Sequence, residues 1–149
     1  MSTEVCFMGK LYALYVRKYS TNWANAVQKI DFPAFLESLK AADSQTALSP
    51  SRLAGVLELP LQDLASLARV HRNTVQSAPN SPKLQSAMRD VLRVLSAAQQ
   101  HHGDLNKALF WFRNFPIPQF GHATPIELVA QGKAQLLIEH LEATGASRT

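Results

Sequence analysis

The 149-residue chain has a single cysteine, Cys6, and no long apolar run. One cysteine excludes an intramolecular disulfide and a cysteine-rich zinc site, so a reducing cytoplasm is the expected compartment. The longest early apolar run, residues 11–16, is far too short to span a bilayer. Arg17 and Lys18 follow it where a signal peptide would have a small-residue cleavage site. We therefore expect no signal peptide and no membrane anchor.

Catalytic and phosphate-binding patterns are also missing. His122 and His140 are isolated in the sequence, and no serine or cysteine lies in a recognisable nucleophile motif. His101 and His102 are adjacent, so on a helix their side chains point apart, and we expect a solvated helix end with no metal. The glycine-containing loop at residues 120–124 lacks the repeated glycines of a phosphate cradle. The sequence therefore predicts a non-enzymatic protein without a cofactor.

The chain does contain enough apolar sequence for a core and a modest excess of positive charge. Hydrophobic residues make up 46%, and 15 Lys and Arg against 11 Asp and Glu leave a formal charge of +4. This apolar content argues against disorder throughout, and the length fits one domain or two small ones sharing a core. The basic balance is compatible with a polyanionic partner, although it also fits an ordinary, mildly basic soluble protein.

We predict an all-α fold, because apolar residues recur at helical spacing and no alternating strand pattern appears. Asp31 can cap one helix, and Ser49 followed by Pro50 opens another. Residues 1–22 are compatible with either a helix or a strand. The clearest linker is the turn-forming stretch 77–82. The predicted regions are an N-terminal helical extension without an assigned role (1–48), a helix-turn-helix region (49–80) and a small helical C-terminal region (81–149).

The C-terminal region has its own helical pattern. Apolar residues at steps of four and three predict a long helix to about Gln100, and its apolar face consists of Leu84, Met88, Val91, Leu95 and Ala98. Gly103 and Asp104 end this helix and cap the next. Thr124 and Glu127 have the spacing of a capping box, so a short helix should start at Pro125 and fray near Gly132. A last helix, which Gly145 can end, carries Ala134, Leu137, Ile138 and Leu141.

Residues 64–76 have the spacing typical of a helix-turn-helix. Ala65 is small where the two helices would approach, and the shared apolar face consists of Leu64, Ala68, Val70 and Val75. The second helix would present side chains that can hydrogen-bond to base edges. The predicted DNA-binding residues are Arg69, His71, Arg72, Asn73, Thr74 and Gln76. A homodimer is expected, because one reading helix covers only half of a typical operator.

Two residues depart from the usual helix-turn-helix pattern. Arg69 stands in the turn where glycine is frequent, so we expect either a left-handed residue there or a differently built turn. His71 stands where Ser, Thr, Asp or Asn would be the usual N-cap. The alternative interpretation of residues 61–78 is an ordinary helical hairpin in which Arg72 and Gln76 are merely solvated.

Residues 110–120 hold five of the twelve aromatic side chains. A helix cannot bury three consecutive aromatic residues on one face, so with Phe112 in the core either Phe110 or Trp111 is expected near a surface. Two explanations for that surface remain open. A neighbouring helix or the N-terminal segment covers it, or a partner binds there.

Three segments of the C-terminal region carry a resemblance to a known family. They are Ala-Leu-Phe-Trp-Phe at 108–112, Pro-Ile-Pro-Gln-Phe-Gly-His at 116–122 and Thr-Pro-Ile-Glu-Leu at 124–128. In this order they resemble the toxin-binding signature of the Xre, MbcA and ParS antitoxins, which is an Ala-x-x-Trp-Leu-like helix end, a Pro-x-Pro-x-x-Gly-Gly turn and a Thr-Pro-x-Glu-Leu helix start. The resemblance covers residues 49–143. His122 replaces the second glycine, and Phe112 stands where leucine is common.

The resemblance implies a type II antitoxin that joins an Xre-like helix-turn-helix to a toxin-binding domain. Such a protein represses its own promoter and neutralises a toxin, most often of the NAD-consuming RES class, by covering the toxin's active-site entrance. The implied partners are this toxin, operator DNA and a second copy of the chain. The expected toxin-binding residues are Trp111, Phe120, Gly121, His122, Lys133, Leu137, Leu141 and Arg148.

Two alternatives accompany this interpretation. The chain could be a stand-alone helix-turn-helix regulator whose C-terminal region only dimerises. The tail, residues 146–149, could enter a partner's cleft through Arg148, or it could be a frayed end without a function.

Overall fold

The computed structural model describes residues 31–146, with side chains as far as Thr144. The expectations for Cys6, for residues 1–22 and for Arg148 lie outside this range. Within it the protein is all-α, as predicted, and its only extended pairings are isolated bridges between Lys40 and Leu48 and between Ile117 and Ala123. The helices are α2 (Phe32–Leu39), α3 (Pro50–Val56), α4 (Leu61–Ala68), α5 (Arg72–Ser77), α6 (Pro82–His102), α7 (Leu105–Asn114), α8 (Pro125–Ala130) and α9 (Ala134–Ala146), with a 3-10 turn η1 (Pro118–Phe120).

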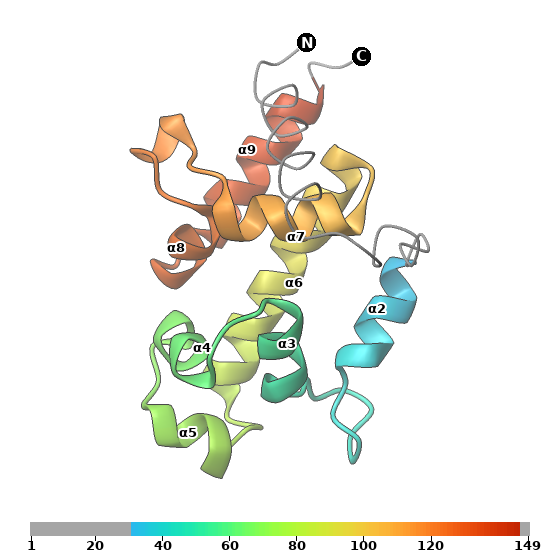
Figure 1. Ribbon diagram of the computed structural model, residues 1–149, viewed down its shortest axis with the longest axis vertical. Helices are drawn as coiled ribbons and strands as arrows, with labels where there is room; N and C mark the ends of the chain where they lie inside the picture. The colour runs from blue at the N-terminus through green and yellow to red at the C-terminus, as the bar shows by residue number, and fades with distance from the viewer. Residues whose placement is uncertain (1–30, 147–149) are drawn as a thin grey trace, which may run out of the picture.

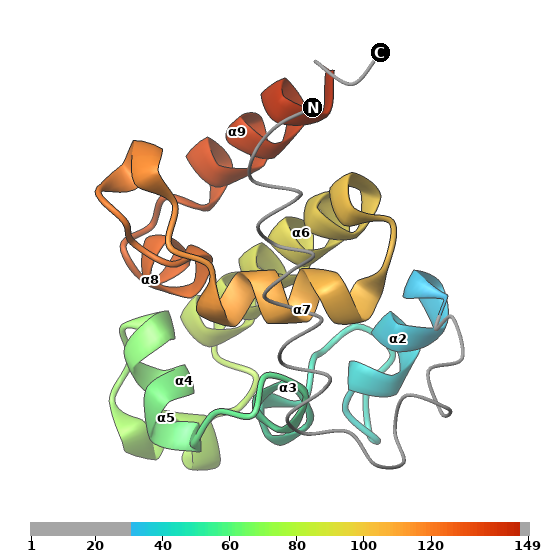
Figure 2. The same cartoon turned by 45° about the horizontal axis from the view of Figure 1, so that its top comes forward.

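The long helix α6 forms the centre of the molecule. Helices α7 and α9 pack along it, while α3, α4 and α5 gather near its N-terminal end (Figures 1 and 2). The predicted apolar face of α6 is confirmed, since all five of its residues are fully buried: Leu84, Met88, Val91, Leu95 and Ala98. The 3.6-residue periodicity of α6 therefore determines which side of the helix the other elements cover.

Three of the predicted capping residues bond at helix starts, whereas Asp31 occupies the N-cap position of α2 without a side-chain capping hydrogen bond. The Ser49 hydroxyl accepts from the Arg52 N–H at 3.4 Å, and Asp104 Oδ1 accepts from the Asn106 N–H at 2.7 Å. The Glu127 carboxylate accepts from the Thr124 N–H at 2.8 Å, which is the reciprocal bond of a capping box. Helix ends are less predictable. Gly103 ends α6 in the left-handed conformation, but α9 continues through Gly145 to Ala146, so the prediction that Gly145 ends it is wrong.

The hydrophobic core runs across the predicted linker at 77–82. Buried side chains from both sides of it belong to one cluster, and α4 packs against both α6 and α8. The Arg113 guanidinium on α7 also reaches back to the segment after α3, where it pairs with Glu58 and donates to the Leu57 carbonyl at 3.4 Å. Residues on the two sides of the predicted linker therefore share one apolar interior.

The three consecutive aromatic residues of α7 are all buried. Phe110 is 8% exposed, Trp111 4% and Phe112 0%, so the expectation that Phe110 or Trp111 lies near a surface is wrong. That expectation considered a helix packed on one face, whereas α7 contacts both α6 and α8. A helix with neighbours on more than one side can bury consecutive residues.

The end of α6 is also more enclosed than the sequence predicts. His101 is only 8% exposed, and its ring lies edge-on to that of His102, with centroids 4.8 Å apart. The His102 ring in turn packs on Trp111, with centroids 5.5 Å apart. The prediction of a solvated helix end is therefore wrong for His101, and α7, which packs along α6, brings Trp111 onto the neighbouring His102 ring.

Candidate DNA-binding and partner-binding surfaces

Helices α4 and α5 form a hairpin with a tight turn, residues 69–71. Arg69 adopts the left-handed conformation, with φ 55° and ψ 42°, and so takes the backbone geometry for which glycine is usual. The Val70 N–H then donates to the Ala65 carbonyl at 3.0 Å. Leu64, Ala68 and Val75 are buried between the helices as predicted, whereas Val70 is only half-buried.

His71 caps the second helix. Its backbone is extended, and its Nδ1 accepts from the Asn73 N–H at 3.2 Å. The imidazole therefore accepts the capping hydrogen bond that a Ser or Asp side chain usually accepts at this position. This contact explains how α5 begins without a common N-cap residue.

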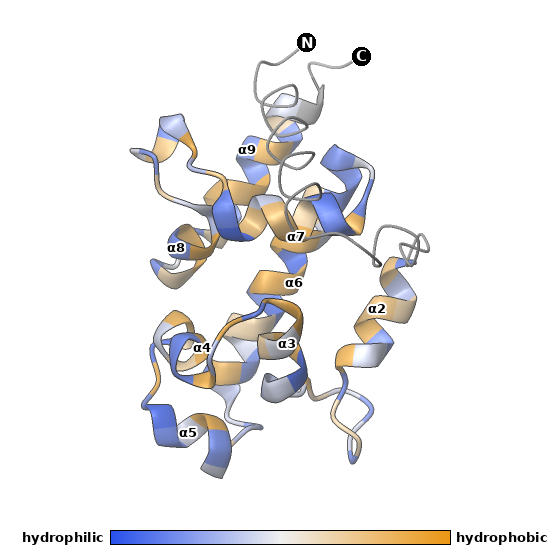
Figure 3. Ribbon diagram, in the orientation of Figure 1, coloured by the Kyte–Doolittle hydropathy of each residue, from blue (hydrophilic) through white to orange (hydrophobic). Residues whose placement is uncertain are grey.

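The outer side of α5 is polar and solvated. Arg72, Asn73 and Gln76 are exposed, and Figure 3 colours most of this short helix as hydrophilic. Their side chains form no hydrogen bond or ion pair with any other described residue; we call these three residues the α5 polar face. Thr74 is half-buried. Guanidinium and carboxamide groups are the side chains that pair bidentately with guanine and adenine in the major groove, so this face has the chemistry of a base reader.

Arg69 lies apart from the α5 polar face. Its Nε donates at 2.8 Å to the carbonyl of Ala130, the last residue of α8. The last carbonyls of a helix have no partner within the helix, so this guanidinium satisfies one that would otherwise need water. The bond joins the α4–α5 turn to the C-terminal region.

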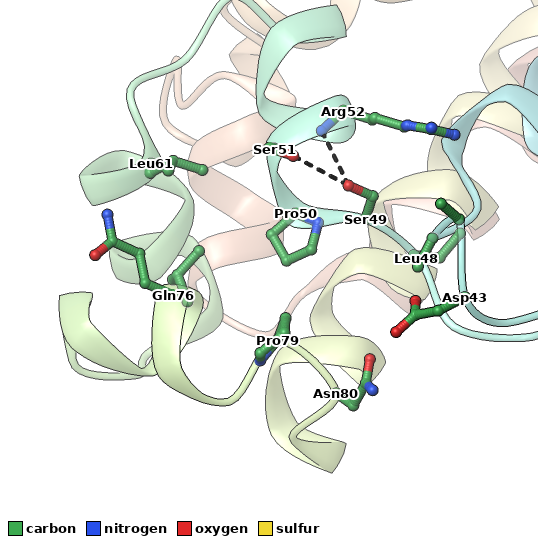
Figure 4. A pocket seen from close by; sticks show the side chains of 13 residues that line it. Asp43, Leu48, Ser49, Pro50, Ser51, Arg52, Leu61, Gln76, Pro79 and Asn80 are labelled. Atoms are coloured by element: carbon green, nitrogen blue, oxygen red, sulfur yellow. Dashed lines mark hydrogen bonds between the residues drawn. The ribbon is translucent and has the colours of Figure 1, made fainter.

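An open pocket of about 560 Å³ lies beside α5 (Figure 4). Pro50, Leu61, Val75 and Pro79 contribute apolar walls, while Gln76 lies at one end and Asp43 and Asn80 lie at the other. The Arg52 guanidinium is already engaged, because its Nη1 donates to the carbonyls of Ser38 and Lys40. No nucleophile and base meet in this pocket, and nowhere in residues 31–146 do three His, Cys, Asp or Glu side chains gather in a metal-binding group.

The Pro-rich turn of the C-terminal region, residues 116–122, protrudes between α7 and α8 (Figure 1). The Ile117 N–H donates to the Ala123 carbonyl at 3.0 Å, which closes a small hairpin. Gly121 and His122 at its tip have φ values of 67° and 63°. Positive φ at both central residues is typical of a type I′ turn, for which Gly-Gly is a favoured pair. His122 therefore adopts the conformation that a glycine would take here.

Replacing His122 tests the cost of this turn. His122→Val should destabilise the protein by about 1–2 kcal/mol, because a β-branched residue is a true outlier at positive φ. His122→Gly should leave stability unchanged or raise it by up to about 1 kcal/mol. Urea denaturation followed by circular dichroism measures both changes. Equal stability of the valine and glycine variants would contradict the left-handed assignment.

The predicted toxin-binding residues fall into two groups. Gly121, His122 and Lys133 are exposed, and Phe120 is half-buried, with its ring edge-on to His140 and centroids 5.5 Å apart. The others that the structure describes are core residues with no more than 4% exposure: Trp111, Leu137 and Leu141. A role in partner binding for these three would be indirect, through the helices that they hold in place.

Sequence reasoning missed Leu136. Among the described residues it is the large apolar side chain that stays exposed, at 51%. It lies one turn before His140 on α9, so the two share a side of the helix. The sequence could have predicted this exposure, because Leu136 is apolar but lies off the apolar face formed by Ala134, Leu137 and Leu141.

Comparison with known proteins adds no further constraint: no protein-family model, no curated protein and no solved structure matches this chain. Among the helices of residues 31–146, none combines the length and the apolar character needed to cross a membrane. The candidate functional surfaces of the described residues are therefore the α5 polar face and the Pro-rich turn with its neighbours on α9.

Proposed function

We propose that this protein is a type II antitoxin that represses its own promoter and neutralises a partner toxin, with the RES class as the expected partner. The observation that carries the proposal is the α5 polar face. Arg72, Asn73 and Gln76 stand in solvent without a described partner, on a helix whose other side is packed against α4. Three side chains that can hydrogen-bond to base edges are thereby presented together on one short helix.

The size of α5 supports binding as a homodimer. A helix of six residues reaches only a few base pairs of one major groove, so two copies on successive turns of DNA are needed for an operator of ordinary affinity. The formal charge of +4 favours association with the phosphate backbone.

The Pro-rich turn supports the antitoxin part of the proposal. Left-handed backbone at both Gly121 and His122 fits the Gly-Gly of the antitoxin signature, so the substitution by histidine preserves the turn. Lys133, immediately before α9, is exposed, and Phe120 in the turn is half-buried, so part of each side chain is accessible. We propose that Gly121 and His122, together with Phe120 and Lys133, contact the toxin. We also propose that the protein itself is not an enzyme.

A stand-alone regulator is the second candidate. The observation that favours it is Leu136, since an exposed leucine on the last helix is suited to a contact between two copies. In that case the C-terminal region would dimerise the protein and bind no toxin.

Co-expression with the adjacent reading frames separates the two candidates. An antitoxin should co-purify with one neighbour, restore growth when that neighbour is induced, and shift the DNA upstream of its own reading frame in a gel. A regulator should shift DNA and purify as a homodimer without a protein partner. If no upstream or scrambled duplex is bound at low salt, both candidates fail.

The last residues provide a further prediction. Ending the chain after Ala146, which removes Arg148, should weaken toxin binding at least about tenfold, because a charged hydrogen bond contributes about 1.5–3 kcal/mol. Operator affinity should stay within about twofold, since the core is intact and surface changes are small. Growth rescue and calorimetric titration measure the two effects. Full protection by the shortened chain would eliminate a role for the tail.

A further inference from the structure

Gln85 is a buried polar side chain in the middle of the fold. It lies on α6 with 4% exposure, and its carboxamide makes three hydrogen bonds, one through its oxygen and two through its N–H groups. Its Oε1 accepts from the Leu48 N–H at 2.9 Å, and its Nε2 donates to the carbonyls of Leu48 and Pro79, each at 2.9 Å. A buried carboxamide whose two N–H groups and oxygen all have partners favours one arrangement of the chain around it.

The partners of Gln85 lie at the two ends of the helix-turn-helix region. Leu48 immediately precedes Ser49, the N-cap of α3, and Pro79 immediately follows Ala78, the C-cap of α5. One side chain of the C-terminal region therefore sets the distance between the start of α3 and the end of α5. Leu48 and Pro79 both line the pocket of Figure 4, together with Val75 and Gln76 of α5 and Pro50 of α3, so the pocket lies between the end of α5 and the start of α3.

The other end of α5 is also tied to the C-terminal region. Arg69, three residues before Arg72, donates from Nε to the Ala130 carbonyl of α8. We call the Gln85 hydrogen bonds the first tie and the Arg69–Ala130 hydrogen bond the second tie. Between these two ties α5 has a single buried residue, Val75, and the helix packs mainly against α4. Packing alone thus leaves the direction of this short helix weakly determined.

We propose that Gln85 and Arg69 are positioning residues that orient the α5 polar face for operator recognition without touching the bases. The inference depends on the proposed DNA-binding function and goes beyond it, because it makes α6 and α8 part of the recognition device. It also changes the role of Arg69, which the sequence predicted to bind DNA: here its guanidinium binds the end of α8. Loss of either tie lets α5 turn, which misaligns base contacts but leaves the surface charge that attracts phosphates.

Full-length Gln85→Met tests the first tie, because methionine fills a similar volume without hydrogen bonds. Anisotropy titrations use a duplex of the DNA upstream of the reading frame and a scrambled duplex of equal length. We expect affinity for the upstream duplex to fall about tenfold or more, as for loss of one base contact, and affinity for the scrambled duplex to stay within about twofold. Gln100→Met, at an exposed glutamine of the same helix, is the matched control and should change neither affinity.

Arg69→Gly tests the second tie at an exposed position where glycine accepts the left-handed backbone, so it remains informative if Gln85→Met fails to fold. A positioning role predicts loss of preference for the upstream duplex with an almost unchanged salt slope on the scrambled one. A phosphate contact predicts weaker binding to both duplexes and a salt slope lower by about one. The second pattern, or an unchanged preference in this variant, would overturn the proposal.

Hydrogen exchange supplies a measurement that does not involve DNA. Both variants should speed exchange at the amide of Ala78, which closes α5 by donating to Thr74, while the interior of α6 stays protected. If the parent protein binds no DNA selectively, the proposed function fails and this measurement still tests the two ties. Unchanged exchange in α5 of both variants would refute them.

Discussion

Phe112→Ala should lower the free energy of unfolding by about 3–5 kcal/mol, the usual cost of removing a buried phenyl ring. Phe112 is fully buried in α7 and belongs to the cluster that also contains Leu64 and Ala65 of α4. Since typical domains have only about 5–15 kcal/mol of stability, this loss should be a large fraction of the total. Urea denaturation measures the change directly.

The shared core has a functional consequence for this variant. Operator binding and partner binding should be lost together as temperature rises, because one cluster supports both surfaces. Glu142→Ala, at an exposed position of α9 outside the proposed contacts, is the control and should change stability by no more than about 0.5 kcal/mol. Operator binding that survives in Phe112→Ala after partner binding has gone would show that the two regions unfold independently.

The double variant Arg72→Ala with Gln76→Ala should have the largest effect on recognition. Each substitution removes a base-reading side chain worth about 1–3 kcal/mol, so the pair should cost about 2–6 kcal/mol of operator binding if their effects add. Stability should hardly change, because both side chains are exposed and have no described partner. Titration of the upstream duplex, with unfolding measured in parallel, checks both statements.

A charge-matched control separates base reading from general attraction. Arg89→Ala removes an exposed cation from α6 and should lower binding to all duplexes slightly and uniformly. The Arg72 and Gln76 pair should instead abolish the preference for the upstream duplex over a scrambled one. If the double variant binds the upstream duplex like the parent, α5 is not the reading helix, and the interpretation of residues 61–78 as an ordinary hairpin gains support.

The sequence by itself determined the helices and most of their starting points. Capping by Ser49, Asp104 and Glu127 and the apolar face of α6 involve residues two to four positions apart, and such local contacts can be read from spacing. At Arg69, in the turn position where glycine is frequent, the sequence left two outcomes open, and the structure has the left-handed one. The amphipathic spacing was sufficient to establish an all-α fold.

Two features were decided only by the tertiary structure. One is which helix surfaces outside the apolar face are covered, and the other is which groups the polar side chains bind. Trp111 and His101 are buried because α7 folds back along α6 and also contacts α8, and no spacing within α7 encodes those neighbours. Gln85 bonds to a residue 37 positions away, and Arg69 to one 61 positions away, so nothing in either local sequence marks the contact. Periodicity specifies one face of one helix, whereas the assembly of helices selects the partners of every group that lies off that face.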